Sequence, residues 1–519
     1  MAWFSPDPLL LPDILALNSR WLRRKPALIV DDATSSWAAF GDATARAANA
    51  LRGIGLAQGE RVIVLMNNSA EMAEVMFGAV RGGLVAVPLN VSVGDEAVAG
   101  MIANSEAKAV VASGEHMARI ERLCPRLDPA LSARLVGIEP GLAGWLDYRA
   151  IRDAASPEIG DVRVAPGDEC NLIYSSGTTG MPKGIVHSHA CREAWASDMA
   201  VALRYHSGAR TLCNLGLYSN ISWVAMLATF FAGGTLCIQR RFAPADCLQA
   251  VQDQNITHAA MVPVQYQRLL EYEHFDRYDL SSLQALMCCG SPLSVGLKAE
   301  IMQRIPGAFI ELYGLTEGLV TILAPEDMRQ KIGSVGRPCP GQHLAILDEQ
   351  DKELPSGEAG EIVGFSRFIM SGYHNNDAAN EEATWVSPCG SRWLRTGDIG
   401  RIDDDGFLYL VDRKKDMIIS GGQNIYPADI EAVLIRHEDV SEVAVIGVAS
   451  EKWGETPVAV IVPRQGAKPD VDAVMKWANA ELGRQQRIAA AVLVDELPRN
   501  PNGKILKRDL RRRYASMRL

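Results

Sequence analysis

The sequence predicts an α/β protein with a large N-terminal domain of helix-covered sheets, a β-rich subdomain and a small C-terminal α/β domain. Three observations support this fold class. Short apolar strands alternate with helical patterns through most of the first 330 residues, which indicates parallel sheets covered by helices. Near residue 330, short strands and turns replace that alternation. Beyond Asp412 a second, smaller α/β pattern begins.

The N-terminal alternation starts with "RVIVLM" (61–66), an amphipathic stretch at Ala70–Val80 and "LVAVPL". Further buried strands are expected in "KAVVAS", "RLVGI", "CNLIYS", "THAAMVP", "ALMCCG" and "AFIELYG". Sheets of this kind bind their ligands at the loops that follow the strands, so the glycine-rich breaks in this region are the first places to look for a site.

The stretch from Thr211 to Gln239 contains no charged residue. Asn214 and the pair Gly233–Gly234 interrupt it, whereas a bilayer helix needs about 20 predominantly apolar residues in a row. We therefore expect no transmembrane segment. We expect a buried strand in "TLCNLGL", a helix near Ser222–Phe231 and a strand in "GTLCIQ".

The second half of the chain predicts a β-rich subdomain followed by a separate domain. Strands are expected in "HLAILDE" and "GEIVGF", and "TGDIGRIDDDGFLYLVDR" predicts a hairpin that turns at Asp405-Gly406. The stretch 416–519 is long enough for a domain of its own. It holds "VSEVAVIGVAS", "TPVAVIVP", a helix near Val471–Leu482 and "AAVLVDELP".

Composition narrows the class of protein. The net charge of −10 argues against a nucleic-acid partner, although the tail from Arg499 onward is basic and could be either a solvated helix or a contact for an anionic ligand. The ten cysteines form neither a disulfide framework nor a zinc pattern, which indicates reduced thiols. The N-terminal residues lack the positive region of a signal peptide, so we expect a cytoplasmic protein. The sequence leaves a homodimer open.

The stretch "YSSGTTGMPKG" (174–184) follows the expected strand "NLIY" and has the composition of a phosphate-binding loop. It is not the common P-loop, because Pro182 and Gly184 occupy positions that this motif reserves for Gly and for Ser or Thr. Lys183 supplies a point charge for outer phosphates. Small and hydroxyl residues that could donate to an anion are Ser175, Ser176, Gly177, Thr178, Thr179 and Gly180. Alone, such a stretch could also be an ordinary turn.

Other stretches add groups suited to a nucleotide. "ELYGLTEG" (311–318) offers the Tyr313 ring for stacking, the Thr316 hydroxyl and the Glu317 carboxylate, an oxygen ligand of the kind Mg²⁺ needs. "RTGD" (395–398) places Asp398 where it could accept hydrogen bonds from ribose hydroxyls. "NPNGKILK" places Lys504 after a Pro/Asn/Gly loop. Each stretch alone could be a helix start, a turn or a solvated tail.

Together and in this order, "YSSGTTGMPKG", "YGLTE", "TGD", "DRKKD" and "NGKILK" resemble the acyl-adenylate-forming superfamily over roughly residues 25 to 511. That superfamily includes acyl- and aryl-CoA synthetases, adenylation domains of peptide synthetases and beetle luciferase. The resemblance implies an ATP-dependent carboxylate–CoA ligase that works through an acyl-AMP intermediate, with ATP, Mg²⁺ and coenzyme A. It also implies a mobile C-terminal domain. The expected domains are then 1–411 and 416–519, with a hinge at 412–415.

The resemblance implies a role for each matching residue. The loop from Ser175 to Lys183 would hold the phosphates, Thr316 would contact the α-phosphate and Glu317 would bind Mg²⁺. The adenine would be framed by Gly290, Ser291, Pro292 and Tyr313, and the ribose would be held by Asp398 and Arg413. Lys415 would be the hinge residue, Gly421 and Gly422 would line the thiol tunnel, and Lys504 would be the catalytic lysine of the C-terminal domain. One ammonium there would relieve the repulsion between the attacking carboxylate and the α-phosphate.

The acyl pocket is expected among residues that are mostly apolar. They are Tyr218, Trp223, Met261, Val262, Cys288, Cys289, Gly314 and Leu315. These residues include no buried cation that could pair with a second carboxylate. The set therefore favours a medium-chain, branched, alicyclic or aryl monocarboxylic acid over a dicarboxylate. The sequence departs from many relatives at Ser219, where a histidine is common, so a relative's acyl preference does not transfer directly.

Three other functions are compatible with parts of this pattern. A stand-alone adenylating enzyme would load the thiol of a carrier protein instead of CoA, although no carrier domain with a phosphopantetheine serine is visible. A luciferase-like oxygenase would form the same adenylate. A non-catalytic nucleotide-binding regulator should lack Lys504 or Glu317, and both are present.

Overall fold

The computed structural model describes residues 8–129, 131–175, 182–420, 423–450, 453–483, 486–499, 503–515 and 517. The chain falls into two compact units. Unit 1 is made of Met1–Ile332, Pro338–Gln342 and Phe365–Glu382, and unit 2 of Gly333–Arg337, His343–Gly364 and Ala383–Leu519. The β-rich strands thus group with the C-terminal segment, whereas the domains expected from the sequence divide near residue 411. The hinge at 412–415 lies within unit 2 and stays a prediction.

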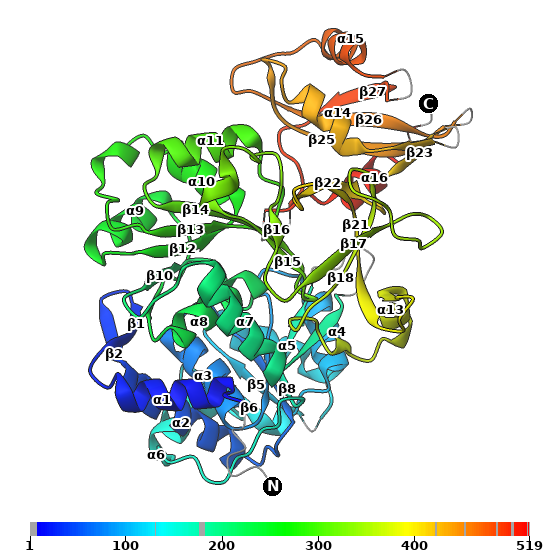
Figure 1. The fold of residues 1–519 in the computed structure, drawn as a ribbon. Coiled ribbons are helices and arrows are strands. Elements are labelled where there is room, and N and C mark those ends of the chain that lie inside the picture. The colour runs from blue at the N-terminus through cyan, green and yellow to red at the C-terminus, as the bar shows by residue number, and fades with distance from the viewer. Residues whose placement is uncertain are drawn as a thin grey trace. The chain divides into compact units, whose positions relative to one another are not determined.

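Two sheets form the frame of unit 1 (Figure 1). Sheet A has the order β16 (Arg337–Pro338), β15 (Val320–Leu323), β14 (Ala308–Gly314), β13 (Ala285–Cys288), β12 (His258–Met261), β10 (Arg210–Cys213), β11 (Thr235–Ile238), β1 (Pro26–Val30), β2 (Ala33–Ser36). Sheet B has the order β19 (Gly372–Tyr373), β9 (Gly184–Ser188), β8 (Glu169–Tyr174), β4 (Val85–Pro88), β3 (Arg61–Leu65), β5 (Ala109–Ala112), β6 (Leu135–Gly137), β7 (Leu146–Asp147). From β14 to β1 and from β8 to β7 all neighbouring strands run parallel, which confirms the predicted parallel sheets.

A layer of helices packs between the two sheets because both sheets present an apolar face to it. Alternation along β3 shows the arrangement: Val62 and Val64 join the core that includes the helices between the sheets, whereas Ile63 and Leu65 join a second core against the outer helices. The inner helices are α1 (Leu11–Trp21), α2 (Trp37–Gly53), α3 (Ala70–Arg81), α7 (His189–Ala202) and α8 (Asn220–Phe231). The outer helices on sheet B are α4 (Asp95–Ser105) and α5 (Glu115–Leu123).

The uncharged stretch around α8 folds as expected, into strand β10, helix α8 and strand β11. Helix α8 is apolar on all sides and is buried along nearly its whole length, as expected for a helix in the middle of a large core. The Ser219 side chain accepts a hydrogen bond from the Ile221 N–H and caps its first turn. Among the described residues, no helix is both long enough and apolar enough to cross a bilayer.

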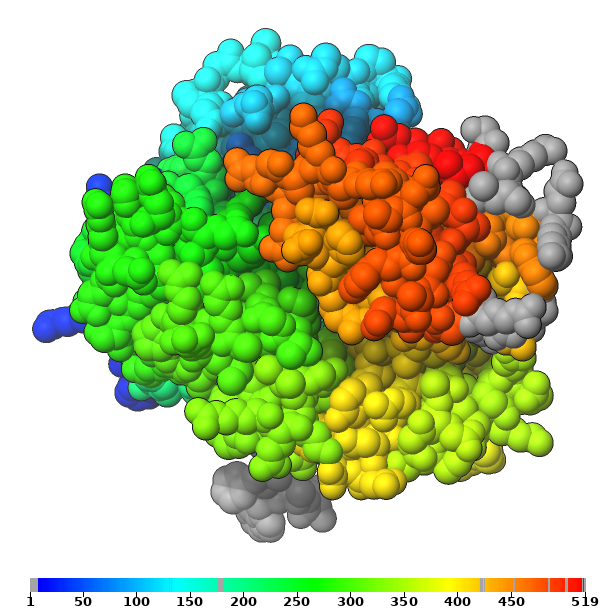
Figure 2. Space-filling view, turned by 90° about the horizontal axis from the view of Figure 1, so that it is seen from above, coloured from blue at the N-terminus to red at the C-terminus, as the bar shows by residue number. Residues whose placement is uncertain are grey.

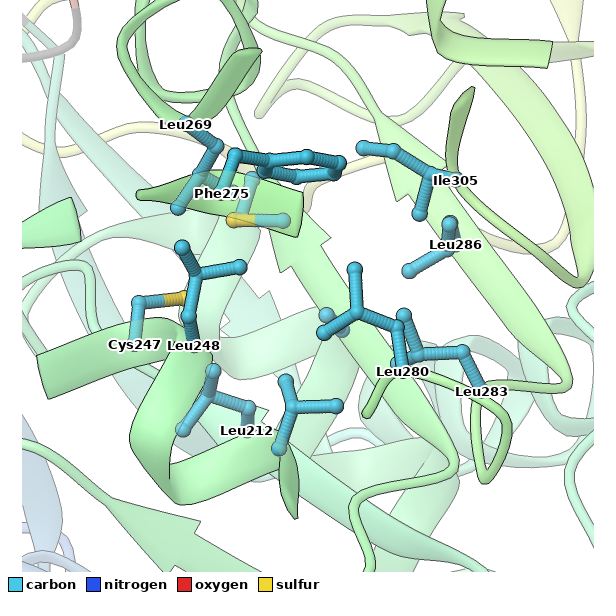
Figure 3. Close-up of a pocket in the computed structure, with 12 residues that line it drawn as sticks. Leu212, Cys247, Leu248, Leu269, Phe275, Leu280, Leu283, Leu286 and Ile305 are labelled. Carbon is cyan, nitrogen blue, oxygen red and sulfur yellow. The ribbon is translucent and has the colours of Figure 1, made fainter. Parts of the chain in front are cut away.

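The far face of sheet A is covered by α9 (Pro244–Asp253), α10 (Pro263–Leu270) and α11 (Val295–Arg304) (Figure 1). Beneath them lies an apolar cavity of about 20 Å³, shown in Figure 3. It is lined by Leu212, Cys247, Leu248, Val251, Ala259, Met261, Leu269, Phe275, Leu280, Leu283, Leu286 and Ile305. The space suffices for about one water molecule but offers it no polar partner, so it is a packing defect and far too small for an acyl group.

Unit 2 contains two smaller sheets, and the strands predicted from the sequence are found in both. Sheet C has the order β17 (His343–Leu347), β18 (Gly360–Phe365), β21 (Arg392–Ile402), β20 (Thr384–Val386), and β22 (Leu408–Arg413) also pairs with β21. Sheet D has the order β24 (Gln423–Ile425), β23 (Ile418–Ser420), β26 (Gly454–Pro463), β25 (Val440–Ser450), and β27 (Ala490–Leu493) also pairs with β26. In Figure 2 the described residues from about 440 onward, which include β25 and β26, are coloured orange to red.

The remaining elements are short or lie on sheet D. In unit 1 they are α6 (Tyr148–Ala154), α12 (Pro325–Met328) and α13 (Asp377–Glu382), while β16 (Arg337–Pro338) spans the boundary between the units. In unit 2 they are α14 (Pro427–Leu434), α15 (Val471–Glu481) and α16 (Lys507–Arg513). The first two pack on one face of sheet D and Leu510 of α16 on the other, so both faces of the sheet are covered.

All ten cysteines are free thiols. Eight are buried and Cys124 is half-buried, while Cys389 is exposed. The Cys389 sulfur lies 3.1 Å from Ser387 Oγ and 3.4 Å from Ser391 Oγ. These hydrogen bonds lower the pKa of Cys389 to about 7, with Ser387 as the main cause.

Replacement of Phe230 tests the aromatic core between the two sheets. The Phe230 ring lies 4.9 Å from Phe77 and 5.5 Å from both Trp37 and Phe40, measured between ring centres. We expect Phe230→Ala to lower the free energy of unfolding by about 3–5 kcal/mol, because it removes a fully buried ring and leaves a cavity. The matched control is Phe231→Ala, since that neighbour is 39% exposed. Equal losses for the two variants in urea denaturation would contradict this account of the core.

Candidate functional site

The hairpin of β8 and β9 carries the candidate phosphate loop. The two strands pair antiparallel up to Tyr174 and Gly184, and the Ser175 N–H then donates to the Lys183 carbonyl at 3.0 Å. The Tyr174 hydroxyl oxygen lies within hydrogen-bond distance of the Met101 carbonyl oxygen, at 3.0 Å, and of Asn104 Oδ1, at 2.8 Å, so the base of the loop is anchored to α4. Ser175 and Lys183 are therefore fixed at the two ends of the loop. Ser176, Gly177, Thr178, Thr179 and Gly180 lie outside the described residues.

Tyr373 connects Lys183 to Glu317. The ammonium of Lys183 lies 4.7 Å from the centre of the Tyr373 ring, within reach of a cation–π interaction. The Tyr373 hydroxyl donates to Glu317 Oε1 at 2.9 Å. Burial and the Glu317 carboxylate both raise the pKa of Tyr373, so its proton stays in place and the hydrogen bond persists. Two predicted site residues that are far apart in the sequence thus contact one tyrosine, Lys183 over the ring and Glu317 at the hydroxyl.

The loop from Gly314 to Gly318 is held by backbone contacts. The Leu315 N–H donates to the Leu319 carbonyl, and the Met370 N–H donates to the Glu317 carbonyl at 2.8 Å. His187 Nε2 lies 2.8 Å from the Thr316 carbonyl oxygen. Gly318 has a φ of +121°, and a Cβ there would lie 2.3 Å from the Phe368 carbonyl oxygen. Glycine is therefore the residue this turn requires, and Thr316 and Glu317 occupy defined positions.

Residues expected around the adenine and the acyl group gather where strands of sheet A end. Because β12, β13 and β14 are parallel neighbours, Val262, Gly290 and Tyr313 follow or end strands at the same edge of the sheet. A Cβ on Gly290, whose φ is +95°, would lie 2.9 Å from Ile221 Cδ1 and 3.2 Å from Val262 Cγ1. The start of α8 thus reaches this edge. Ser291 and Pro292 continue the chain there, and both are at least partly exposed.

The proposed acyl residues differ in burial. Tyr218, Leu315 and Gly314 are half-buried or exposed, whereas Trp223, Met261, Val262, Cys288 and Cys289 are buried. Burial raises the pKa of Tyr218, and raises that of Cys289 to about 12. Met261 lines the small packing cavity beneath α9, α10 and α11, which gives it a structural role.

A buried cation that is not one of the expected acyl residues lies beside this region. The Arg192 guanidinium lies 5.0 Å from the centre of the Trp223 ring and is fully buried. Its nitrogens bond to Asn171 Oδ1 at 2.8 Å, Asn220 Oδ1 at 2.9 Å and His187 Nδ1 at 3.2 Å. The sequence could not reveal it, because "ACREAW" gives no sign that this arginine points inward from α7.

The candidate ribose site lies on the β21–β22 hairpin of unit 2. Asp398 and Arg413 face each other across the antiparallel pair, and Arg413 Nε lies 3.2 Å from Asp398 Oδ1. Thr396 Oγ1 accepts from the Asp398 N–H at 3.0 Å, while the Lys414 N–H donates to the Gly397 carbonyl. The structure therefore brings together the two residues that the sequence placed at one ribose.

Lys504 and Lys415 share the electrostatic surroundings of that hairpin. Burial lowers the pKa of Lys504 to about 7, with the Arg413 cation as the next cause and Asp398 opposing it. Burial lowers the pKa of Lys415 to about 8, and Arg413 again contributes. Arg499 donates to the Gly503 carbonyl at 2.6 Å and pairs with Ile505 in a β-bridge, so the chain beside Lys504 is fixed. Gly421 and Gly422 lie outside the described residues.

Comparison with known proteins identifies the family. A family model described as AMP-binding enzyme matches residues 18–374, and one described as AMP-binding enzyme C-terminal domain matches residues 429–504. The chain is 34% identical to feruloyl-CoA synthase of Amycolatopsis sp over 91% of its length and 92% of that protein. It is 32% identical to the long-chain-fatty-acid–CoA ligase FadD13 of Mycobacterium tuberculosis, over 91% of each chain.

Solved structures agree with this result. ATP-bound MatB from Rhodopseudomonas palustris superimposes with a TM-score of 0.89 at 27% identity, covering 98% of this chain and 99% of that chain. The chain belongs to the AMP-binding enzyme family, with the fold of the adenylate-forming enzymes. Within that family its relatives are acyl- and aryl-CoA ligases, and it is an enzyme of the AMP-forming acid–thiol ligase class.

Replacement of Gly318 tests the turn that holds Glu317. We expect Gly318→Ala to destabilise unit 1 by at least about 2 kcal/mol, because a positive φ disfavours any side chain and the new Cβ would meet a backbone oxygen. The matched control is Gly296→Ala, since a Cβ there meets nothing within 4 Å. Thermal unfolding checks both variants. A Gly318→Ala protein as stable as the control would show that the turn can shift.

Proposed function

We propose that this chain is an ATP-dependent carboxylic acid–CoA ligase that forms an acyl-AMP and then transfers the acyl group to the thiol of CoA. The observation that carries the proposal is the assembly of Lys183, Tyr373 and Glu317, in which one tyrosine contacts a cation with its ring and a carboxylate with its hydroxyl. The Lys183 ammonium can bind the outer phosphates of ATP. The Glu317 carboxylate can bind Mg²⁺, the counter-ion of those phosphates.

In the first step a carboxylate oxygen of the acid attacks the α-phosphorus of ATP, and pyrophosphate leaves. The loop from Ser175 to Lys183 binds the departing phosphates, and Thr316 contacts the α-phosphate. The Glu317 carboxylate fits Mg²⁺, because it is an oxygen donor whose orientation Tyr373 fixes. Mg²⁺, when bound, would neutralise phosphate charge. Asp398 and Arg413 orient the ribose, and the ring of Tyr313 together with Gly290, Ser291 and Pro292 encloses the adenine.

Lys504 supplies the positive charge for the first step. The attacking carboxylate and the α-phosphate repel each other, and an ammonium between them lowers the barrier. In the second step the CoA sulfur attacks the acyl carbon and AMP leaves. Gly421 and Gly422 leave room for the pantetheine arm, and rotation about Lys415 exchanges Lys504 for this glycine loop. The reaction needs no group beyond ATP, Mg²⁺, the acid and CoA.

The proposed acid is a medium-chain, branched, alicyclic or aryl monocarboxylic acid. In the region where the acyl group is expected, apolar carbons of Ile221 and Val262 lie beside Gly290. The buried Arg192 does not argue for a second carboxylate, because Nε and both terminal nitrogens already bond to protein groups. The feruloyl-CoA synthase is named for an aryl acid and the long-chain-fatty-acid–CoA ligase for fatty acids. Both kinds of acid are apolar, as the proposal requires, but these names do not indicate which of them this enzyme uses.

The test of the function is a pyrophosphate-release screen across carboxylic acids, with and without CoA. We expect release with one apolar monocarboxylic acid, and an acyl-CoA product only when CoA is present. A chain that releases pyrophosphate but transfers the acyl group only to a phosphopantetheinylated carrier protein would be the stand-alone adenylating enzyme instead. Light emission would indicate a luciferase-like oxygenase, and ATP binding without turnover would indicate a non-catalytic regulator.

The pH profile tests the role of Lys504. Because the ammonium is the active form and the pKa in the unliganded enzyme is about 7, kcat/KM for acyl-AMP formation should fall about tenfold per pH unit above that value. Lys504→Ala should lose about 10²–10³-fold in that step and still convert supplied acyl-AMP and CoA. Lys468→Ala, at an exposed site in the same unit, is the control. The role of Lys504 would be contradicted if kcat/KM for acyl-AMP formation stayed constant up to about pH 9. It would also be contradicted if Lys504→Ala lost both half-reactions equally.

A further inference from the structure

Arg192 is a buried cation whose partners in the described chain are neutral. It forms its hydrogen bonds with two asparagine oxygens and one imidazole nitrogen. The ionisable groups that act on it, apart from its own burial, are the buried thiols Cys191 and Cys170. A buried charge without a carboxylate has a large solvation cost, which the hydrogen bonds offset only in part. A buried arginine of this kind does not stabilise the fold by its charge. We therefore look for its role in the candidate site.

The partners of Arg192 lie on three elements near the candidate phosphate and acyl sites. Asn171 is on β8 and His187 on β9, the two strands that carry the phosphate loop. Asn220 is the first residue of α8, just after Tyr218. His187 in turn forms a hydrogen bond with the carbonyl of Thr316. The Arg192 guanidinium therefore connects, through its partners, the β8–β9 hairpin, helix α8 and the turn that contains Thr316 and Glu317.

The chemistry of arginine fixes the proton on His187. A guanidinium nitrogen can only donate, so His187 Nδ1, which lies 3.2 Å from Arg192 Nη2, must accept. In a neutral ring the proton is then on Nε2, which faces the Thr316 carbonyl oxygen at 2.8 Å. Burial and the Arg192 cation both lower the pKa of His187, so the ring is neutral and keeps one donor and one acceptor. Without Arg192 the ring could take the other tautomer, and Thr316 would face an unprotonated nitrogen.

We propose that Arg192 and His187 act as a pair of positioning residues, in which Arg192 selects the tautomer of His187 and His187 holds the Thr316 carbonyl, so that Thr316 and Glu317 are placed for acyl-AMP formation. This inference rests on the proposed function for its consequence in catalysis, but the tautomer is a property of the folded chain alone. Loss of the pair should impair the first half-reaction and spare the second.

The activity test compares two replacements of His187. His187→Leu removes both hydrogen bonds, whereas His187→Gln keeps an oxygen for Arg192 and an N–H for Thr316. We expect His187→Leu to lower kcat for pyrophosphate release by about 10²-fold, the scale of a misplaced reacting group, with KM for ATP changed much less. His187→Gln should restore most of that loss. Both variants should convert supplied acyl-AMP and CoA at close to the normal rate.

The control is His189→Leu, because that histidine is also buried at the start of α7 but neither of its ring nitrogens has a hydrogen-bond partner among the described residues. It should keep the normal rate of pyrophosphate release. The melting temperature of each variant checks folding. Equal activity of the Leu and Gln variants, equal loss of both half-reactions, or equal loss in the His189→Leu control would overturn the proposal.

A second measurement does not depend on activity. Nitrogen NMR of protein labelled in its histidines, with the His187 signals assigned by their absence in His187→Leu, reports the tautomer near neutral pH. We expect a protonated Nε2 and an unprotonated Nδ1, and a change of that pattern in Arg192→Met. A protonated Nδ1 in the native protein, or an unchanged pattern in Arg192→Met, would overturn the proposal. Absence of pyrophosphate release from the native enzyme with every acid would instead count against the proposed function.

Discussion

Pairing of the short strand β19 with β9 is the constraint on which the candidate site of unit 1 depends. Gly372 and Tyr373 pair with Val186 and Ile185, so a segment far along the chain joins the strand that follows the phosphate loop. The pairing puts the Tyr373 ring against Lys183 and its hydroxyl against Glu317. Nearby, the Met370 N–H binds the Glu317 carbonyl. A few backbone hydrogen bonds thereby set the positions of the cation and the carboxylate together.

Sequence patterns predicted most of the fold because apolar periodicity is a local property. The amphipathic stretch at Ala70–Val80 is α3, the helix expected near Ser222–Phe231 is α8, and the Asp405-Gly406 turn joins β21 to β22. Parallel pairing in both large sheets followed from the alternation of strands and helices. The grouping of the β-rich strands with unit 2 did not follow, because it depends on packing between distant segments.

The sequence indicated candidate site residues where a residue type and a motif coincide, as for Glu317, Asp398 and Lys504. It did not indicate Tyr373, His187 and Arg192, for a physical reason. Each contacts partners on other elements, and these contacts form only when β19, β9 and α7 are packed together. A tyrosine in "SGYHNN" or an arginine in "ACREAW" has the same local pattern whether it faces solvent or the site.

The charges around Lys504 couple protonation to ligand binding. Arg413, Lys415 and Lys504 lie near the carboxylates Asp398 and Asp416, and burial lowers the pKa of both lysines. An anion bound beside Lys504 would raise that pKa again, so the unliganded enzyme would take up a proton as it binds. Near neutral pH the Lys504 ammonium would be only partly protonated in the empty site and more fully protonated with an anion bound.

The distribution of thiols has a practical consequence. Among ten cysteines, only the side chain of Cys389 is both exposed and hydrogen-bonded in a way that favours its thiolate near neutral pH, while eight of the others are enclosed in the core. Alkylating reagents act on thiolates, so a maleimide dye offered briefly at neutral pH should attach to this one position of the native chain. Unit 2 thus carries a natural attachment point for a fluorophore, and the dye could be attached without first replacing any residue.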